Sequence, residues 1–586
     1  MKELQHLNKY FLKYKTQVII GIIITIVSNL FSVLVPNLIG KTIDIVNTQI
    51  ENPERSLSVF KAELLEIILY VIGTAVAAGI LTFFMRQTII NVSRYVEYDL
   101  KNEIYQQYQK LSLNFYKKNR TGDLMNRISE DVGKVRMYAG PAIMYSFNTI
   151  TLFVVALIFM FRQAPLLTFY TIIPLPILSL IIYKISKEIH KRSTAVQLNL
   201  SKLSEFTQEA FSGISVIKAY GIEPQTQKNF NHLAEQSKAK HVHLERIHAF
   251  FFPMMILLIG ISNVIVIYVG GNQYINGEIS LGNILEFIIY VNMLTWPVAT
   301  VGWVTSIVQQ AEASQKRINE FLNVEPEIQN TIEAPSKING NIEFKDVHFT
   351  YDDTNIKALQ GVSFKVNSGE TLAIIGKTGS GKTTILDLIG RLYDIDKGAL
   401  LIDGQPINKL NLTSLRDAIG YVPQEAFLFS DTINNNIKFG KEQATDEEVI
   451  QAAKNAQVHK NISEFTNGYN TILGERGITL SGGQKQRVSI ARAIIKAPKI
   501  LLFDDCLSAV DTETEEKILK NLSKVSSGKT TIIVSHRISS AKNADQIIVL
   551  DNGKIVQQGT HNQLIETQGY YNTLYTKQLS KDPSLE

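Results

Sequence analysis

The chain has 586 residues and a formal net charge of +5, with hydrophobic residues at 45% and charged residues at 19% of the total. This length exceeds one hydrophobic core, and the low charge content fits a membrane part joined to a soluble part. The small basic excess argues against nucleic-acid binding, and the single cysteine, Cys506, excludes an intrachain disulfide and a multi-cysteine metal cluster.

The N-terminal part contains six apolar stretches long enough to cross a membrane, which takes about 20 residues at roughly 1.5 Å each. They cover residues 16–39, 64–84, 141–161, 166–183, 250–270 and 281–308. We therefore expect an all-α transmembrane domain over residues 1–324. Because six is an even number, both ends of this domain lie on the same side of the membrane.

The charges that flank these stretches predict the orientation. Lysine and arginine are dense between residues 184 and 246 and absent between residues 271 and 282. The N-terminal arm carries Lys2, Lys9, Lys13 and Lys15. By the positive-inside rule both termini are cytoplasmic, as expected for a multi-pass protein of the cell (inner) membrane.

Residues 1–14 place four apolar side chains roughly on one helical face, namely Leu4, Leu7, Phe11 and Leu12. This pattern predicts an amphipathic helix in the membrane interface, and a disordered tail is the alternative. Two long segments between the stretches, 86–137 and 184–246, show helical periodicity with many charges. As cytoplasmic helical hairpins, each would extend roughly 35–45 Å from the membrane.

Residues 325–341 are polar and contain two prolines, a composition typical of a linker. Beyond the linker, short apolar runs rich in β-branched residues alternate with helical stretches. The runs lie at residues 371–375, 500–503, 530–535 and 546–550. This alternation predicts an α/β domain over residues 342–578, followed by a flexible tail over residues 579–586.

A phosphate-binding loop directly follows the run at 371–375 and precedes a helical stretch that begins at Thr384. Its sequence is Gly376-Lys377-Thr378-Gly379-Ser380-Gly381-Lys382-Thr383. The glycines let backbone amides surround phosphate groups at a helix N-terminus. Lys382 would reach the β- and γ-phosphates, and the Thr383 hydroxyl would bind Mg²⁺. The motif predicts ATP binding through these residues and Thr384, and a glycine-rich turn without a ligand is the alternative.

The run at 500–503 ends in two carboxylates, Asp504 and Asp505. In proteins with a phosphate loop, the acid at the end of such a buried strand holds Mg²⁺, either directly or through water. We assign this role to Asp504, because it lies about 120 residues beyond the loop. Without that context, two acids at a strand end are usually structural.

The segment Leu480-Ser481-Gly482-Gly483-Gln484 resembles the signature of the ATP-binding cassette (ABC) transporters. Alone, a Ser-Gly-Gly sequence before a helix is an ordinary N-cap. In the family, this segment contacts ATP that is held by the phosphate loop of a second subunit, so the resemblance implies a dimer. The six-span layout with long inner arms is similar to the exporter branch, which includes multidrug exporters and lipid flippases.

Three single residues match further positions of the family pattern. Tyr351 resembles the aromatic residue that stacks on adenine, Gln424 the glutamine that contacts Mg²⁺, and His536 the histidine that contacts the γ-phosphate. The resemblance therefore implies catalytic roles for Gln424 and His536, together with Asp505. Without it, these are ordinary strand or loop residues.

Several segments also match the family. Gly474-Glu475-Arg476-Gly477 resembles the exporter segment that contacts the inner arms, and Ser508-Ala509-Val510-Asp511 resembles the loop that crosses the dimer interface. Phe115-Tyr116 is typical of the first inner arm, and residues 213–220 are typical of the second. The alternative for both arm segments is ordinary charged helix.

The chain departs from the family at Asp505, where glutamate usually positions the attacking water. The shorter side chain withdraws the carboxylate by roughly 1–1.5 Å, and a misplacement of about 1 Å costs on the order of a hundredfold in rate. We therefore expect ATP to bind and hydrolysis to be slow. Exporter subunits with aspartate here are common in heterodimers, so we favour a heterodimer, with a homodimer as the alternative. Cys506 is either a reactive thiol or, as we favour, buried packing.

The resemblance implies an ATPase coupled to export, or leaflet flipping, of a small amphipathic or lipid-like substrate across the lipid bilayer. ATP and Mg²⁺ would be its ligands, and a second ABC half-transporter subunit its partner. The alternative is a nucleotide-gated channel or regulatory membrane protein on the same scaffold. The polar residues of the spans do not identify the substrate. The asparagines could line a cavity, but helix–helix hydrogen bonds explain them equally well. These residues are Asn29, Asn148, Asn263, Asn292 and Trp296.

Overall fold

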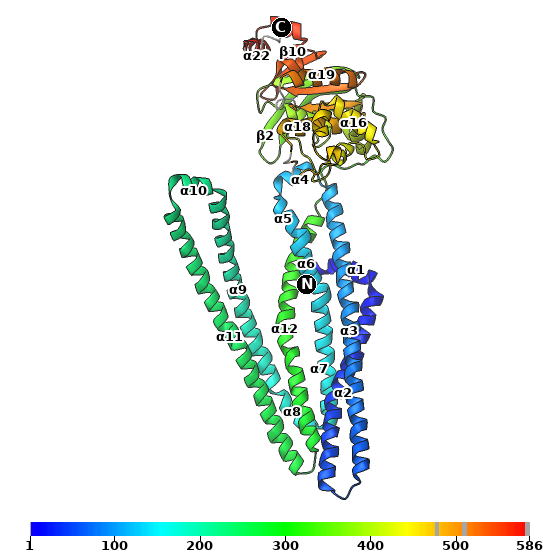
Figure 1. Ribbon diagram of the computed structural model, residues 1–586, viewed down its shortest axis with the longest axis vertical. Helices are drawn as coiled ribbons and strands as arrows, with labels where there is room; N and C mark the ends of the chain where they lie inside the picture. Colours follow the sequence, from blue (N-terminus) through cyan, green and yellow to red (C-terminus); the bar gives the residue numbers. More distant parts are fainter. Residues whose placement is uncertain (1, 475–476, 478–479, 507–511, 581–586) are drawn as a thin grey trace. The chain divides into compact units, whose positions relative to one another are not determined.

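A computed structural model describes residues 2–474, 477, 480–506 and 512–580 of the chain. These residues form two compact units. The first combines Met1–Tyr108 with Gly122–Val324, and the second combines Gln109–Thr121 with Glu325–Glu586 (Figure 1). We call them the membrane unit and the ATPase unit and describe each by itself.

Within the described residues, five helical segments of the chain are long and apolar enough to cross a membrane. Four of them are single helices, α2 (Lys15–Glu51), α3 (Leu57–Lys110), α11 (Glu223–Ile275) and α12 (Leu281–Leu322), and the fifth, Thr121–Gln163, ends in α7 (Ile143–Gln163). These segments contain the predicted stretches 16–39, 64–84, 141–161, 250–270 and 281–308. The N-terminal part is therefore a helical transmembrane domain.

The remaining predicted stretch, residues 166–183, is divided between two helices. They are α8 (Pro165–Ile172) and α9 (Pro174–Ser212). Pro174 supplies no backbone N–H for a helical hydrogen bond, which is why a new helix begins there. The number of six membrane crossings stays a prediction.

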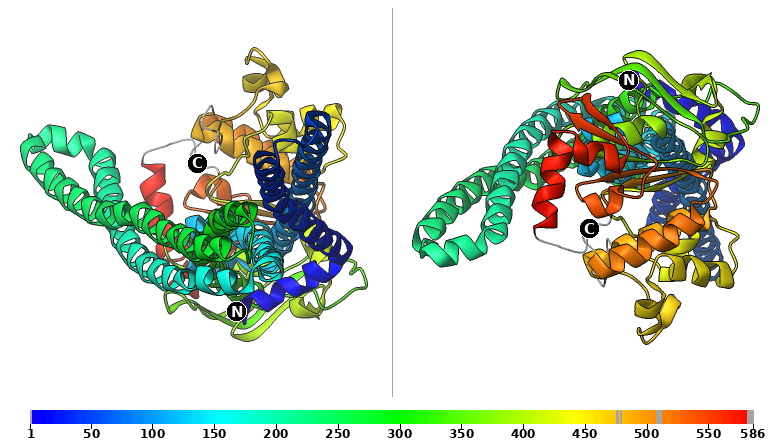
Figure 2. Two further views of the ribbon diagram at one scale, coloured as in Figure 1. Left: turned by 90° about the horizontal axis from the view of Figure 1, so that it is seen from below. Right: turned by 90° about the horizontal axis from the view of Figure 1, so that it is seen from above.

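The two inner arms are helical, as the periodicity predicted, but they are built differently. In the second arm, α9 and α11 run side by side and carry α10 (Ile214–Tyr220) at their tip, away from the other helices of the membrane unit (Figure 1, Figure 2). In the first arm, α3 forms one continuous side of the hairpin. The other side is divided into short helical pieces. These are α4 (Leu113–Lys118), α5 (Thr121–Asn126), α6 (Val132–Met137) and two π-helical turns, η2 (Arg127–Asp131) and η3 (Tyr138–Ala142).

The N-terminal segment is helical, through a 3₁₀ turn, η1 (Glu3–Leu7), and the short α1 (Asn8–Lys13). The predicted apolar face is divided between two environments. Leu4 and Leu7 are buried against the protein, whereas Leu12 is 69% exposed. The apolar spacing alone does not distinguish these environments, because protein and lipid both accept apolar side chains. Only the Leu12 side of this helix is available to lipid.

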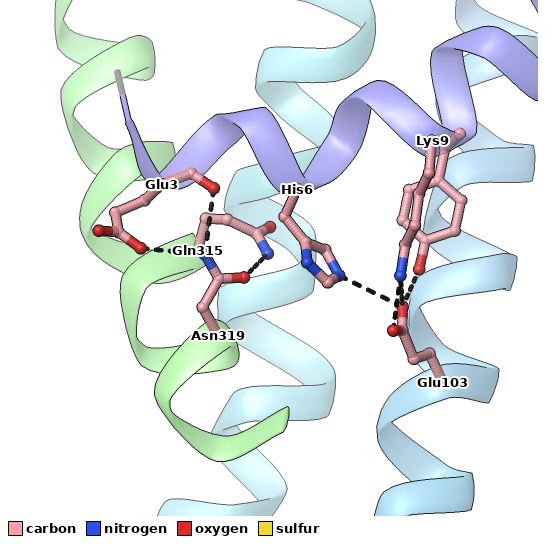
Figure 3. A network of polar contacts seen from close by, with 7 residues as sticks. Glu3, His6, Lys9, Glu103, Gln315 and Asn319 are labelled. Carbon is pink, nitrogen blue, oxygen red and sulfur yellow. Dashed lines mark hydrogen bonds and ion pairs between the residues drawn. The ribbon is translucent and has the colours of Figure 1, made fainter. Parts of the chain in front are cut away.

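Charged contacts attach this segment to α3 and α12 (Figure 3). The Glu103 carboxylate on α3 accepts hydrogen bonds from Lys9, at 2.6 and 2.7 Å, and from Tyr10. Burial raises the pKa of Glu103, but hydrogen bonds from His6, Lys9 and Tyr10 outweigh it and lower that pKa to about 2. On α12, the Asn319 amide donates to the Glu3 carboxylate at 3.0 Å. The N-terminal segment therefore joins two helices of the membrane unit.

The C-terminal half of α2 and the first turn of α12 meet at two glycines. A Cβ atom on Gly282 would lie 2.1 Å from the carbonyl oxygen of Gly40, so only glycine allows this approach. The Asp44 carboxylate accepts from the Gly282 amide at 2.8 Å and from the Ser280 hydroxyl at 2.7 Å. A carboxylate at the N-terminus of a helix is favourable for the helix dipole, so Asp44 of α2 stabilises the first turn of α12.

The ATPase unit contains two sheets. The smaller has the strand order β2-β1-β4-β5 and the larger has the order β10-β9-β3-β8-β7-β6. The smaller sheet is antiparallel and consists of β1 (Ile342–Tyr351), β2 (Ile356–Val366), β4 (Lys397–Ile402) and β5 (Gln405–Pro406). The larger consists of β3 (Thr371–Gly376), β6 (Ile419–Val422), β7 (Ile500–Asp504), β8 (Thr530–Ser535), β9 (Gln546–Asp551) and β10 (Lys554–Gly559).

All strands of the larger sheet except β10 are parallel, and β8 lies between β3 and β7. The four predicted runs coincide with β3, β7, β8 and β9, which confirms the α/β fold. Because carboxyl ends of parallel strands meet at one edge of a sheet, the residues that follow β3, β7 and β8 are brought together there.

The helices of the ATPase unit complete two main cores. One core lies around the smaller sheet and α13 (Lys382–Ile389). The other core is formed by β6, β7 and a group of helices that pack against them. The latter helices are α15 (Ile433–Lys438), α16 (Asp446–Asn455), α17 (His459–Ser463), α18 (Gly482–Ile495) and α19 (Thr512–Val525). The remaining helices are α14 (Leu412–Asp417), α20 (Ile538–Ala541), α21 (His561–Glu566) and α22 (Tyr570–Leu579).

We predict that Gly282→Ala destabilises the membrane unit, because the added methyl group forces α2 and α12 apart. Overpacking of this kind costs about 1–3 kcal/mol. The measurement is the thermal unfolding temperature of the detergent-solubilised chain. Gly271→Ala on α11 is the matched control, since a Cβ atom there meets nothing within 4 Å. Equal unfolding temperatures for the two variants would contradict the close packing of α2 and α12.

Candidate functional site

The phosphate loop connects β3 to α13 and holds the Lys382 side chain inside the ATPase unit. Lys382 is 6% exposed. Its ammonium donates to the carbonyl oxygens of Gly376 and Lys377, at 2.9 and 2.8 Å. Burial lowers its pKa, and the negative charges of Asp505 and Asp504 oppose that shift. The loop therefore presents a buried cation together with the backbone amides at the start of α13, an arrangement that binds phosphate groups.

Two loop glycines are required by close contacts. A Cβ atom on Gly381, whose φ is +100°, would lie 2.3 Å from the carbonyl oxygen of Ala358, and one on Gly376 would lie 2.3 Å from that of Leu550. The Ser380 hydroxyl is buried and has no hydrogen-bond partner among the described residues. An unpartnered buried hydroxyl beside a buried cation fits a loop that is completed by an anionic ligand.

The metal-binding side of the site is formed by α13 and β7. The Thr383 hydroxyl donates to the Asp504 carboxylate at 3.1 Å, and Asp504 is the last residue of β7. Hydroxyl and carboxylate oxygens are the ligands that Mg²⁺ prefers in proteins. This donor set therefore fits a magnesium ion next to bound phosphates.

Asp505 and His536 face the same region from adjacent strands. The Asp505 backbone lies in the left-handed region, with φ at +43°, and its amide donates to the Val534 carbonyl on β8 at 2.9 Å. Burial raises the pKa of Asp505, while the nearby His536 and Lys382 lower it. Burial and the Lys382 charge lower the pKa of His536, and the Asp505 carboxylate opposes that shift. The two side chains therefore lie in a single electrostatic environment.

Tyr351, at the end of β1, reaches the same loop through its hydroxyl, which lies 3.0 Å from the Thr384 hydroxyl. One contact of this ring was not predicted from the sequence. The Lys117 ammonium of α4 lies 4.6 Å from the centroid of the Tyr351 ring and 4.9 Å from that of Tyr393. Nearby, the Asn114 side chain donates to Glu327 at 2.9 Å. The sequence marks the neighbouring Phe115-Tyr116 as typical of the first inner arm, but it contains no signal for this long-range contact.

The signature segment lies at the N-terminus of α18. Ser481 is the N-cap of α18 and forms a reciprocal capping box with Gln484. The structure therefore confirms that this serine is an ordinary helix N-cap. Leu480 is buried, whereas Ser481 and Gly482 are exposed. Among the residues that the structure describes, no hydrogen bond joins 480–484 to the phosphate loop. An exposed, capped helix N-terminus can accept an anion from outside the unit.

The other predicted residues lie in different situations. Gln424 is exposed two residues beyond β6, and its carbonyl oxygen accepts from the Gln486 side chain of α18. The Gln486 contact was not predicted. Cys506 is buried, and burial raises the pKa of its thiol, which agrees with inert packing. Glu475, Arg476 and residues 508–511 lie outside the described part of the chain.

Together, apolar membrane helices and a phosphate loop at the edge of a parallel sheet define a membrane protein with a fused nucleotide-binding ATPase. The transmembrane region of ABC transporters matches residues 18–298, and the ABC transporter family matches residues 359–508. The chain belongs to the ABC transporters and is an ATPase coupled to transport.

Three relatives are similar over most of their length. One is a probable multidrug resistance ABC transporter ATP-binding/permease protein, YheI, of Bacillus subtilis (strain 168), 36% identical over 98% of this chain and 97% of its own. Another is the multidrug resistance-like ATP-binding protein MdlA of Escherichia coli (strain K12), 33% identical over 99% and 97%. The third is an ATP-dependent lipid A-core flippase of Syntrophus aciditrophicus (strain SB), 35% identical over 88% and 85%.

The site predicts a pH effect through Asp387, on the buried side of α13. Burial raises the pKa of this carboxyl to about 6, well above the value of about 3.9 that an unfolded chain gives. Its contribution to stability is therefore complete at low pH and is lost as the pH rises through about 6. One pKa unit corresponds to about 1.4 kcal/mol, so the loss is on the order of 2–3 kcal/mol.

We predict that Asp387→Asn removes this loss, because asparagine has nearly the same shape and no ionisable proton. The unfolding temperature of the solubilised variant should exceed that of the original chain at about pH 7.5 and should approach it at about pH 4. The difference between the two curves is the measurement. Parallel curves across this range would show that Asp387 is already ionised.

Proposed function

We propose that this chain is one subunit of a dimeric ABC exporter that moves a small amphipathic or lipid-like substrate across the cell membrane. Its two termini lie in the cytoplasm, and two ATP molecules are held between the ATPase units of two subunits. The names of the relatives, which refer to multidrug resistance and to lipid A-core flipping, support this class of substrate. The exposed Ser481 cap carries the dimer proposal, because it is a helix N-terminus that no hydrogen bond among the described residues joins to the phosphate loop of its own chain.

A second surface supports the need for a partner. The helix α10, at the tip of the second arm, contains no buried residue, and Tyr220 at its end is 78% exposed. Ile214 and Val216 are also exposed. An apolar group of this kind is unusual on a surface that faces water. In the proposed dimer, the partner subunit covers it.

We propose the following roles for the residues of the site. Lys382 and the amides of the loop bind the β- and γ-phosphates, Tyr351 stacks on adenine, and His536 contacts the γ-phosphate. Thr383, Asp504 and Gln424 hold Mg²⁺. When bound, this ion neutralises charge on the phosphate oxygens. The other side of the nucleotide is contacted by the signature segment of the partner subunit.

The Asp505 carboxylate supports an asymmetric assembly. Aspartate is shorter than the usual glutamate, so the site in which Asp505 lies binds ATP and cleaves it slowly. The signature segment of this chain is intact and completes a competent site with the phosphate loop of the partner. We therefore propose a heterodimer.

In the proposed cycle, ATP binding closes the two ATPase units, and hydrolysis at the competent site reopens them. The energy that drives closure comes from the higher affinity of ATP for the closed state.

Purification of the chain from its native membrane tests the assembly. We expect a second, related subunit with glutamate at the position equivalent to Asp505.

ATP-dependent accumulation of an amphipathic fluorescent dye in inside-out vesicles tests export. Sustained ion conductance in place of dye accumulation would favour a channel.

We predict that Asp505→Glu raises ATP turnover at the site of this chain by on the order of tenfold or more, because the longer side chain restores the position of the carboxylate. The measurement is single-turnover hydrolysis by the purified complex. Lys382→Ala removes the phosphate-binding cation and is the control, because the hydrolysis that remains in this variant comes from the other site of the complex. A homodimer with fast ATP hydrolysis that is lost in Asp505→Asn would refute the impaired site.

A further inference from the structure

The loop that carries His536 is held by a side chain from the last described helix of the chain. The Gln578 amide on α22 donates through Nε2 to the carbonyl oxygen of His536 at 2.9 Å. Its Oε1 accepts from the backbone amide of Ile538 at 2.8 Å. A glutamine offers one donor and one acceptor on the same planar group, so Gln578 binds the backbone on both sides of Arg537.

The opposite side of the same loop is held from α19. Glu515 is 1% exposed and pairs with Arg537. Its carboxylate also accepts from the hydroxyls of Ser539, at 2.8 Å, and Ser540, at 2.6 Å. A buried carboxylate is costly without partners, and these partners all come from the segment that follows His536. The loop is therefore bound both by α19 and by α22.

The position of the His536 backbone determines where its imidazole lies, because the side chain has few rotamers. Neither Gln578 nor Glu515 has a role in the proposed contacts with ATP. We propose that Gln578 is a positioning residue through which the C-terminal helix α22 holds His536 against the γ-phosphate of bound ATP. Glu515 supports the same loop from α19. This inference rests on the proposed role of His536.

The helix α22 is anchored independently of Gln578. Tyr571, at its other end, is fully buried, and its hydroxyl lies 2.7 Å from His561 Nδ1. Tyr571 packs in a core with residues of β3, β9 and α20. Loss of the Gln578 amide should therefore release the backbone of His536 and Ile538 from α22 and leave α22 in place, while Glu515 still binds the rest of the loop.

Binding of ATP and of ADP to the purified full-length protein tests the proposal, because only ATP has the γ-phosphate that His536 contacts. We expect Gln578→Ala to reduce the ratio of ATP to ADP affinity by on the order of tenfold, as a small displacement of a contact group does. ADP affinity should not change. Thr576→Ala is the matched control, since Thr576 is exposed on the same helix and its hydroxyl donates to the Asn572 carbonyl within that helix.

A double variant separates positioning from general stability. If Gln578 acts through His536, Gln578→Ala has no further effect on the affinity ratio in a His536→Ala background. Additive effects, or a loss of ADP affinity in Gln578→Ala, would overturn the proposal. An original chain that binds ATP and ADP equally would instead refute the role of His536 itself, and a chain that binds neither would refute the proposed function.

Discussion

The buried ammonium of Lys382 is the group on which the geometry of the nucleotide site depends. A buried cation needs acceptors on every side, and here two carbonyl oxygens of its own loop supply them directly. Burial raises the pKa values of the Asp504 and Asp505 carboxyls, and the Lys382 charge opposes that shift, whereas burial and the same charge both lower the pKa of the His536 imidazole. These three residues lie at the carboxyl ends of β7 and β8, and β8 separates β7 from β3, so the sheet order places them around the same charge.

Features set by short-range patterns could be predicted from the sequence. The four apolar runs identified β3, β7, β8 and β9, because β-branched residues in short runs favour strands. The cap at Ser481 was also evident, because a capping box involves residues only three apart. The phosphate loop was recognisable because its glycines, Lys382 and Thr383 form one contiguous motif, although the contact that leaves no space for a Cβ atom on Gly381 is made to the distant Ala358.

Contacts between distant segments could not be predicted. Lys117 lies over the Tyr351 ring only because a short piece of the first inner arm packs within the ATPase unit. Gln578 reaches the backbone of His536 from the C-terminal helix. Periodicity also failed at the N-terminal helix, since it marks Leu4 and Leu12 as apolar without showing which contacts protein. In each case the partner is set by tertiary packing, which one sequence does not contain.

An impaired site is physically compatible with a transport cycle, because closure of the ATPase units depends on binding of ATP and not on its cleavage. A ligand shifts a conformational equilibrium by its difference in affinity for the two states. At the Asp505 site, the cation of Lys382 and the loop that carries it are present, so the proposed cycle retains that difference even with slow cleavage. In the proposed heterodimer, this site therefore keeps the two ATPase units in contact, and turnover at the partner's phosphate loop alone weakens the closed state. The signature segment at Ser481 is then the part of this chain on which the rate of the cycle depends.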